Sequence, residues 1–559
     1  MMRRRRRRRR RRPRHRTGLP AHPVRPSPVV FVLVVFAAWD IAKLAMTVLS
    51  TEHLLVPELC YIDWFSRLSP KEHSQAMQTS VGLVGDGHCM RVATLCAGSE
   101  VPMIWLRSCL RVLRSRHLGV DWQHPSASPS TVLRHVFACE IEPAKQNWIR
   151  KNILPALLFP DVACLGRDKC YDIISGQYVL VPGSDCAIAG TSCKDLSPQK
   201  ATGKQNVMSS ASGTSSVTML GLLAYVSRHQ PACIMGENVL NLLSGENFNW
   251  VREQFRLCGY VLFFVEQDPT FHRVSHSRPR VYFWGFLTTG TLWFVTREAS
   301  VVQGAINAML ERLKHKPCET VDVLEFAPDD TSDTCSNRFI STSVPEFDEE
   351  AKWLQIHVNY CNERSIVYPV QHSAYDLPAA TQEACFPVLT CLPLRELDYV
   401  KVMDKLLCQE SGTGRLQNGK VIFADLSQCV SRECWNFNML PCILPGSKFL
   451  DASEASIISA VHLARMQGIL KTIDTNLNYA VTPERTLADM SGNAMNGWCF
   501  GSTFFVMLAT SASKVNMRVP RKLSSVFAAR LERDDHAEAV AKKHKPDSGL
   551  GILLSLLDK

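Results

Sequence analysis

The chain has 559 residues, of which 46% are hydrophobic, enough for a substantial core and for roughly two to four domains. The formal charge is +11, but twelve arginines lie between Arg3 and Arg16, and subtracting them leaves −1. The body is therefore nearly neutral. Any basic surface for nucleic acid must come from local clustering, because an overall excess of positive charge is excluded.

The arginine run is followed by proline-rich sequence and an apolar stretch from Val29 to Trp39. Together they imitate a secretory signal, but the apolar run is too short to span a bilayer. A nuclear-import or nonspecific nucleic-acid arm fits the same residues, as does a mistranslated gene start without a role. We assign residues 1–85 to a basic, low-complexity N-terminal extension.

The 21 cysteines indicate a reducing compartment. No two have C-x-x-C spacing, so neither a zinc ribbon nor a redox dithiol is signalled, and the odd total argues against a fully paired disulfide framework. Cys429, Cys434 and Cys442 match no zinc template. We therefore expect no metal site.

Regular alternation of strand-like and helical patterns begins near Arg91 and predicts a doubly wound α/β domain. Residues 92–96 read as its first strand, 97–100 as a turn of mostly small residues, and 101–113 as an amphipathic helix. In such folds this turn lets the backbone approach a nucleotide-like ligand, with the helix N-terminus close by.

The next strand, residues 132–139, ends at Glu140. A carboxylate at that place can accept hydrogen bonds from both ribose hydroxyls. The alternative is a solvated glutamate that caps a helix starting near Pro143.

A buried strand at 186–189 then leads into a polar loop that carries Cys193. Lys194, beside the thiol, could favour the nucleophilic thiolate, although a single cysteine is more often a small buried hydrophobe. Residues 199–218 are rich in Ser, Thr, Gly and Lys, and a helix is expected at 217–228. The segment reads as a lid or as an ordinary surface linker.

Two more strand edges carry ionisable residues. Residues 232–235 form an apolar strand that leads to Glu237, and Arg278 and Arg280 stand just before a strand at 281–286. The strand edges thus carry Cys, Glu and Arg in that order along the chain.

This ordered set resembles the C5-cytosine DNA methyltransferase family, as a divergent eukaryotic-type member. The resemblance rests on the strand-end Cys193, the tripeptide Glu237-Asn238-Val239, the arginine pair, and the stretches CAGSE (96–100), ACEIEPAKQNWIRKN (138–152), HLARMQGI (462–469) and MSGNAMNG (490–497). It spans roughly residues 91–510 with an unmatched block in the middle. It implies a Rossmann-like S-adenosylmethionine-dependent methyltransferase domain with an inserted, smaller target-recognition domain.

The resemblance also implies roles for individual residues. The expected catalytic residues are Cys193, Glu237, Arg278 and Arg280. Those expected at the substrate or its loop are Ser192, Asn238, Val239 and His276. The expected S-adenosylmethionine site comprises Cys96, Ala97, Gly98, Ser99, Glu100, Glu140, Ile141, Asp161, Asn493 and Ala494.

Four positions depart from the family pattern. Ser192 stands where proline is usual, Cys96 replaces an aromatic residue, Glu100 replaces a second glycine, and His276 replaces a glutamine. Because the cysteine, the glutamate and both arginines remain, we expect activity, with the cofactor loop as its weakest part.

The predicted organisation is an extension (1–85), a first catalytic part (88–292), a target-recognition domain (293–440), a closing catalytic part (441–512) and a basic C-terminal tail (513–559). Helices are expected at 452–470 and in the apolar sequence after Ser491-Gly497. By resemblance, the motif 491–497 closes the cofactor pocket and returns the late chain to the first domain.

We therefore expect a nuclear enzyme that methylates cytosine in double-stranded DNA, with chromatin proteins as further partners and no stable membrane association. The cytosine must be flipped out of the duplex to reach such a pocket. The alternatives are a tRNA cytosine-5 methyltransferase, which would take RNA as substrate, and an inactive DNA-binding regulatory homologue. A dinucleotide oxidoreductase would need a full glycine fingerprint, which CAGSE does not provide.

Overall fold

The computed structural model describes residues 56–84, 89–96, 98–197, 207–210, 213–289, 298–315, 347–368, 370, 392–411, 422–452 and 456–511. The arginine run, the apolar stretch at 29–39, Ala97, half of the predicted lid (199–206, 211 and 212) and the basic C-terminal tail lie outside these residues.

A seven-stranded sheet in the order β3-β2-β1-β6-β7-β9-β8 forms the centre of the catalytic part. The strands are β1 (Met90–Leu95), β2 (Leu133–Cys139), β3 (Leu158–Phe159), β6 (Cys186–Gly190), β7 (Cys233–Val239), β8 (Tyr260–Gln267) and β9 (Arg280–Leu287). Strand β9 is antiparallel to both of its neighbours, β7 and β8, and the other neighbouring pairs of this sheet are parallel. The strand order reverses at β1, so the crevice beyond the carboxyl ends of β1 and β6 is where such a sheet binds ligands.

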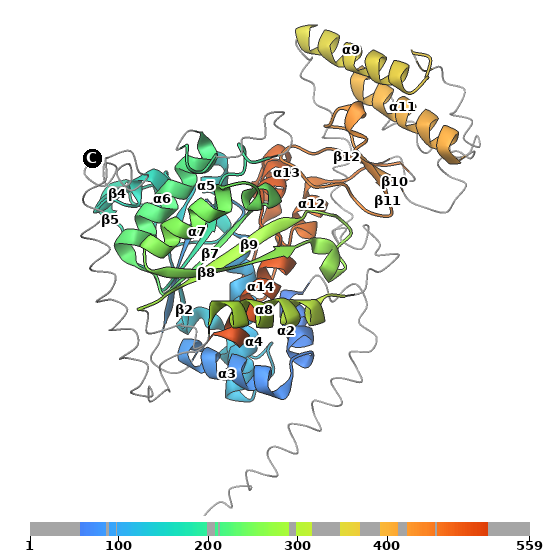
Figure 1. Ribbon diagram of the computed structural model, residues 1–559. Helices are drawn as coiled ribbons and strands as arrows, with labels where there is room; N and C mark the ends of the chain where they lie inside the picture. Colours follow the sequence, from blue (N-terminus) through green and yellow to red (C-terminus); the bar gives the residue numbers. More distant parts are fainter. Residues whose placement is uncertain are drawn as a thin grey trace, which may run out of the picture. The chain divides into compact units, whose positions relative to one another are not determined.

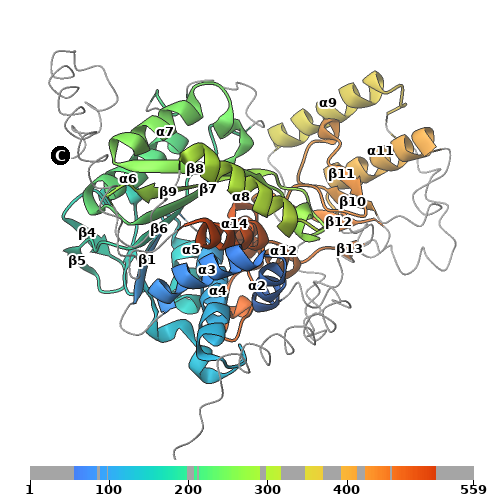
Figure 2. The same cartoon turned by 60° about the horizontal axis from the view of Figure 1, so that its bottom comes forward.

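Helices cover both faces of this sheet, which confirms the doubly wound α/β prediction. Helices α6 and α7 lie on one face, and α4 and α14 on the other (Figures 1 and 2). The helices of this part are α4 (Val101–Leu118), α5 (Pro143–Asn152), α6 (Thr214–His229), α7 (Asn247–Leu257), α8 (Ala299–Leu313), α12 (Ala460–Met466), α13 (Glu484–Asn493) and α14 (Gly497–Thr510). Short 3-10 helices occupy Pro125–Ala127, Pro129–Thr131, Val162–Cys164, Leu240–Leu243, Pro269–His272, Val430–Arg432 and Tyr479–Val481.

The predicted boundary of the N-terminal extension is wrong at its C-terminal end. Helices α2 (Pro57–Ser66) and α3 (Pro70–Val84) pack against α4 and α14. Tyr61, Trp64 and Phe65 are fully buried there, with ring contacts to the late helix α14. Aromatic side chains bury large apolar areas, so this segment belongs to the helical layer of the catalytic part. Helix α8 also packs against α14 and β8, although the sequence placed its residues in the recognition domain.

The described residues of the closing catalytic part, 441–452 and 456–511, are called the late chain here. The late chain returns to α4, the first helix after β1, as the resemblance implied. Trp105 of α4 lies against Gly497 and Gly501 of α14, where an added β-carbon would stand 1.9 and 2.5 Å from the indole. Its Nε1 donates to the carbonyl of Gly468 at 3.0 Å. Glycine at these places lets the indole approach the backbone of α14 directly.

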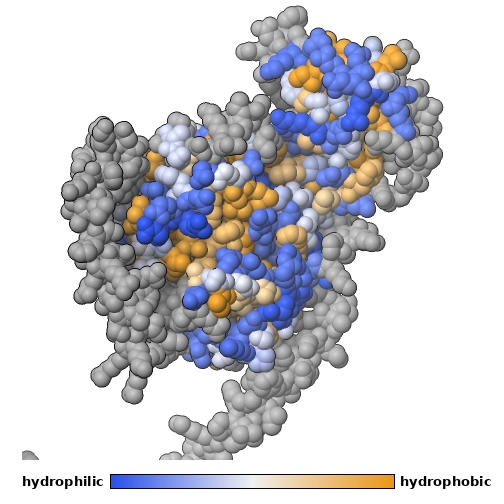
Figure 3. Space-filling view, viewed as in Figure 1, coloured by the Kyte–Doolittle hydropathy of each residue, from blue (hydrophilic) through white to orange (hydrophobic). Residues whose placement is uncertain are grey.

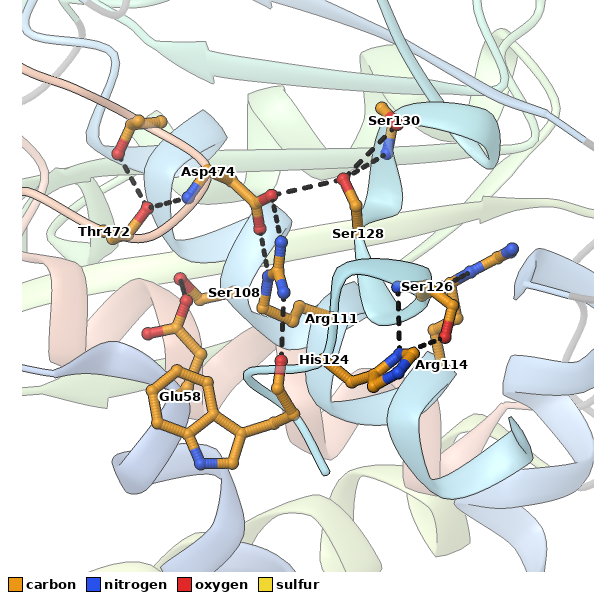
Figure 4. Close-up of polar contacts among 12 residues, drawn as sticks. Glu58, Ser108, Arg111, Arg114, His124, Ser126, Ser128, Ser130, Thr472 and Asp474 are labelled. Atoms are coloured by element: carbon orange, nitrogen blue, oxygen red, sulfur yellow. Dashed lines mark hydrogen bonds and ion pairs between the residues drawn. The ribbon is translucent and has the colours of Figure 1, made fainter. Parts of the chain in front are cut away.

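A second contact ties the loop before α13 to α4 (Figure 4). The Asp474 carboxylate accepts from Nε and Nη2 of Arg111, both at 2.5 Å, and the hydroxyl of Ser128 donates to the same carboxylate at 3.3 Å. A bidentate arginine–carboxylate pair fixes both position and orientation, so this loop has a defined place beside α4.

The middle block of the chain contains a smaller unit with its own core. An antiparallel sheet of order β11-β10-β12-β13 accompanies two helices that pack together, and both sheet and helices contribute buried apolar residues. Its elements are α9 (Phe347–Glu363), α11 (Leu394–Ser411), β10 (Ile422–Asp425), β11 (Trp435–Phe437), β12 (Phe449–Asp451) and β13 (Ser456–Ile457). A separate hairpin joins β4 (Lys169–Asp172) to β5 (Gln177–Leu180).

The helix expected at 452–470 is therefore wrong in its first part. Ile457 pairs with Leu450 in the small sheet, and the helix starts only after Ser459, whose side chain accepts from the N–H of His462. A β-branched residue and a serine cap favour this division between strand and helix.

Apolar surface gathers around the middle of the face shown in Figure 3, over β8 and β9. Strand β8 is the edge of the sheet, and Val261, Leu262 and Phe264 on it are only partly buried. Within the described ranges, the helices are all too short or too polar to cross a membrane.

Candidate active site

The predicted strand and polar loop around Cys193 are present. Strand β6 is buried up to Ala189, and at Gly190 an added β-carbon would lie 2.8 Å from the carbonyl oxygen of Cys96, so only glycine fits where the two strand ends meet. The carbonyl of Cys193 accepts from the N–H groups of Leu196 and Ser197, at 3.0 and 2.9 Å. The cysteine thus sits in a tight turn with its side chain partly exposed.

Glu237 lies on the neighbouring strand β7 and faces the same edge. It pairs in register with Gly190 of β6. The sequence placed Glu237 at the end of its strand, but β7 continues to Val239, because β9 pairs with it over the full length. Gly236 makes room for the ring of Phe283, since an added β-carbon would lie 2.1 Å from it.

Arg280 and Glu237 form a nearly buried ion pair. Arg280 Nε lies 3.1 Å from Glu237 Oε1, and the two side chains are 11% and 9% exposed. Burial raises the pKa of Glu237, opposed by the charges of Arg280 and Arg278. The carboxyl is therefore a group that can hold a proton more easily than an exposed glutamate.

The same charges act on the cysteine. Burial raises the pKa of the Cys193 thiol, and Glu237 raises it further, whereas Arg280 and Arg278 lower it. The sequence pointed to Lys194 as the cation that favours the thiolate, but the two arginines have that role here. Because the net direction is upward, the thiol keeps its proton at neutral pH in the free protein.

Arg278 is held by the late chain. Its Nη1 donates to the carbonyl of Ile443 at 2.6 Å and its Nη2 to that of Ala494 at 3.2 Å. His276 is likewise buried, with Nε2 at 3.1 Å from the carbonyl of Met466, and burial lowers its pKa to about 3. These two predicted site residues therefore join chain segments beside the site, while Arg280 contacts Glu237.

Asn238 holds the start of the cysteine loop, as expected. Its Nδ2 donates to the carbonyl and to the hydroxyl of Thr191, at 3.2 and 2.9 Å. Val239 is buried in the main apolar core of the sheet. The tripeptide thus contributes one charged group, one loop contact and one core residue.

The predicted cofactor loop has an unusual backbone. Cys96, Gly98 and Glu100 have φ values of 52°, 47° and 61°, in the left-handed region that favours glycine. Glu100 is fully buried and accepts from the hydroxyl of Thr94 at 2.7 Å, and burial raises its pKa to about 8. Ser99 is buried, and its carbonyl accepts from Trp148 Nε1 at 3.2 Å.

Glu140 faces this loop. Only 6% of the residue is exposed, which is against the solvated-cap interpretation, and its Oε1 accepts from the N–H of Glu142 at 2.9 Å. A β-carbon on Gly98 would lie 3.6 Å from Glu140 Oε2. Burial raises the pKa of Glu140. Ile141, the next residue, leaves 69% of its surface exposed.

Asp161 lies close to the same strand ends. Burial raises the pKa of Cys96 to about 12, and the negative charges of Glu140 and Asp161 add to this increase. The Asp161 carboxylate accepts from the N–H of Ala163 at 2.9 Å, which fixes its orientation. The structure thus brings together three predicted cofactor residues from the ends of β1, β2 and β3.

Asn493 and Ala494, the two predicted cofactor residues of the late chain, lie in different environments. Ala494 is buried beside Arg278, whereas Asn493 is exposed and donates from Nδ2 to the carbonyl of Asp489 at 3.0 Å. Met495, which the sequence did not single out, places Cε 3.4 Å from a β-carbon added at Gly190. The late chain therefore borders both the cysteine strand and the cofactor loop.

Lys145 lies beside the predicted cofactor loop, although no sequence pattern pointed to it. Only 5% of its side chain is exposed, and its Nζ lies 3.0 Å from Glu142 and 2.8 Å from Asp489. Its Cδ would lie 3.6 Å from a β-carbon on Gly98. A lysine in the first turn of α5 has no sequence signal that links it to α13, because the partners are more than 300 residues apart.

A family model for C-5 cytosine-specific DNA methylases matches residues 129–383. These residues, just under half of the chain, form a domain of this family. The match includes Glu140, Asp161, Cys193, Glu237 and both arginines, whereas the predicted cofactor loop at 96–100 and the predicted late motifs lie outside the matched residues.

Two curated relatives share this assignment. The DNA (cytosine-5-)-methyltransferase DMT5 of Cryptococcus neoformans var. grubii is 35% identical over 198 residues, which is 35% of this chain. The DNA (cytosine-5-)-methyltransferase DMT5 of Verticillium dahliae is 22% identical over 482 residues, or 75% of this chain. The chain spans 8% and 19% of the length of these two relatives.

Similar solved structures include the Dnmt2 methyltransferase of S. pombe, with 14% identity and a TM-score of 0.36, covering 75% of this chain and 98% of that one. The methyltransferase EhMeth of Entamoeba histolytica has 10% identity and a TM-score of 0.34, with coverages of 75% and 98%. The fold assignment itself rests on the strand order and the two helical layers.

Proposed function

We propose that the chain transfers a methyl group from S-adenosylmethionine to C5 of cytosine in double-stranded DNA. One observation carries the proposal. Within the residues that match the family, Cys193 follows the end of β6, and the Glu237–Arg280 pair with a distance of 3.1 Å lies on β7 and β9, the next two strands of the sheet. A thiol, a buried carboxyl with a raised pKa and a fixed cation are the groups needed to add a nucleophile to an electron-poor ring.

In the proposed mechanism, the Cys193 thiol releases its proton to water and the resulting thiolate sulfur forms a bond to C6. The π electrons of the C5–C6 double bond shift through the ring toward N3. Glu237 donates a proton to N3, which neutralises the developing negative charge. The raised pKa of Glu237 suits this donation, since a buried carboxyl keeps its proton at higher pH. Arg280 orients Glu237 and favours the thiolate of Cys193.

S-adenosylmethionine, when bound, supplies a methyl group on a positively charged sulfur that C5 can attack. The C5 proton then leaves to water and the bond between Cys193 and C6 breaks, which restores the double bond and the free cysteine. Glu237 recovers its proton when N3 releases it. Arg278 holds the late chain against the site.

The residues of the cofactor loop fit this ligand. Gly98 leaves an open approach to the Glu140 carboxylate, which would accept from the ribose hydroxyls. The exposed Ile141 offers an apolar face for the adenine ring, and Asp161 is fixed nearby to accept from its amino group. Cys96, Ser99 and Glu100 shape the turn, and Asn493 and Ala494 precede Met495, which reaches Gly190 beside Cys96.

The DNA side of the proposal concerns the smaller unit. Its separate core and its place between the two catalytic parts of the sequence support a role in target recognition. The cytosine would have to leave the duplex, at an unstacking cost of a few kcal/mol. We also propose a nuclear location with chromatin proteins as partners, which imaging of the tagged full chain would test.

A trapped covalent adduct tests the function directly. The purified chain is incubated with S-adenosylmethionine and duplex DNA containing 5-fluorocytosine, because fluorine at C5 blocks the final elimination. We expect an adduct with the unmodified chain and with the control Cys258→Ser, a partly buried cysteine after α7, and none with Cys193→Ser.

The parallel arms separate the alternatives. Glu237→Gln should form the adduct much more slowly, because the amide cannot donate its proton to N3. An adduct with 5-fluorocytosine RNA alone would favour an RNA methyltransferase. Cofactor or DNA binding without any adduct would contradict the proposed reaction and favour a regulatory protein.

A further inference from the structure

The peptide just before Cys193 is held by a side chain of helix α6. The backbone N–H of Ser192 donates to the hydroxyl of Thr218 at 3.0 Å. That hydroxyl is itself oriented toward the carbonyls of Thr214 and Ser215, both at 3.1 Å. A hydroxyl can donate one hydrogen bond and accept another, so Thr218 links the cysteine loop to the first turns of the helix.

A reciprocal pair of hydrogen bonds holds the residues after Cys193 to the same helix. The Asp195 N–H donates to the Ser215 hydroxyl at 3.0 Å, and the Ser215 N–H donates to the Asp195 carboxylate at 2.9 Å. The N-cap residue of α6, Gly213, provides no side-chain cap, and an added β-carbon there would stand 2.7 Å from Asp195. Asp195 thus caps α6 from the loop.

The opposite side of the loop is held by β7 and the turn after it. Asn238 binds Thr191, and Asn241 donates to the carbonyl of Leu196 at 2.8 Å. Cys193 is therefore a partly exposed residue in a loop that is fixed at both ends. Between Thr191 and Cys193, the Ser192 N–H contact to Thr218 is the one that sets the orientation of the peptide leading into the nucleophile.

We propose that Thr218 is a positioning residue for the Cys193 nucleophile. The inference rests on the proposed function and extends it to a residue that makes no contact with the reacting atoms. A proline at position 192 would fix its own φ angle but has no N–H to donate. Serine leaves that angle free, and Thr218 restrains the peptide through the N–H that serine retains.

The test measures the single-turnover rate of covalent adduct formation on 5-fluorocytosine DNA. Thr218→Val keeps the shape of the side chain and removes the acceptor, and we expect a rate about tenfold lower, typical of losing one hydrogen bond that positions a reacting group. Thr218→Ser keeps the hydroxyl and should stay within about twofold of the unmodified chain. Thr214→Val, at an exposed threonine one turn earlier, is the matched control.

Two further readouts separate positioning from general damage. DNA affinity, cofactor affinity and the melting temperature should be the same for Thr218→Val and Thr214→Val, while amide hydrogen exchange at Ser192 should increase only in Thr218→Val. Thr218→Ala gives a second removal of the hydroxyl if the valine variant folds poorly.

Equal adduct rates for Thr218→Val, Thr218→Ala and the unmodified chain would overturn this inference alone. Failure of Thr218→Ser to restore the rate would also overturn it. Absence of an adduct in the unmodified chain would instead overturn the proposed function, and this inference with it.

Discussion

The buried carboxyl of Glu100 makes a quantitative prediction for Glu100→Gln. Glutamine has nearly the same shape and keeps an oxygen that can accept from Thr94, 2.7 Å away in the structure, but it cannot ionise. The groups that face Glu100 are Thr94, His135 with Nε2 at 4.0 Å, and the charges of Glu140 and Arg107. The substitution therefore isolates the cost of one buried negative charge.

The magnitude follows from the pKa. Burial, with a smaller contribution from the charge of Glu140, raises the pKa of Glu100 from 4.5 to about 8 in the folded chain. Between these values the unfolded carboxyl is ionised while the folded one still holds its proton, so the stability of the unmodified chain falls as pH rises. A tenfold change in proton affinity is about 1.4 kcal/mol, which gives a total on the order of 5 kcal/mol.

The assay is urea unfolding of both chains at pH 4.5, 6, 7 and 9. The variant should gain unfolding free energy relative to the unmodified chain as pH rises, by about 3 kcal/mol at pH 7 and about 5 kcal/mol above pH 8. Any constant effect of the amide cancels in this comparison. Glu253→Gln, at a carboxyl whose pKa is lowered by its hydrogen bond to Arg256, should show no such gain between pH 6 and 9, because this carboxyl is ionised in both the folded and the unfolded chain there. A difference for Glu100→Gln that does not change with pH would refute the reasoning.

Three further predictions concern the site and its support. Gly236→Ala should destabilise the fold by about 2 kcal/mol or more in urea unfolding, because its β-carbon would lie 2.1 Å from an aromatic ring of β9; Gly304→Ala, with open space around it, should be neutral or stabilising, and equal effects would contradict this. Arg280→Leu should raise the pKa of Cys193, shift the pH–rate profile of adduct formation to higher pH and lower the rate at pH 7 by roughly a hundredfold; an unshifted profile would argue against it. Lys145→Met should weaken S-adenosylmethionine binding several-fold in calorimetry, because its links to Glu142 and to α13 are lost; a loss no larger than that of the exposed Lys151→Met would count against this role.

The sequence was sufficient for the local features of the site. The buried run before Gly190, the abrupt change to polar residues and the cysteine that follows predicted a strand and a tight loop, because apolar burial and turn chemistry are encoded over a few neighbouring residues. The same holds for β2 with Glu140 at its end and for the helix after the cofactor turn. The resemblance, which is a matter of motif order, supplied the family.

Other features depend on partners that are distant in the sequence. Glu237 lies inside β7 because β9 pairs along it, and Ile457 forms a strand because Leu450 lies opposite. The two arginines look alike in sequence, yet Arg280 contacts Glu237 while Arg278 binds carbonyls of the late chain. No local pattern distinguishes them, because each contact is made by a residue far along the chain.

The sequence by itself therefore determined which residue types stand at the ends of the strands and in what order. The tertiary structure decided which of them meet, which are buried and how their pKa values move. It brought Thr218 to the loop before Cys193 and Lys145 to Asp489. The physical reason is that hydrogen bonds and ion pairs depend on distances of a few ångströms, and only the packed sheet and helices set those distances between segments that the chain itself keeps apart.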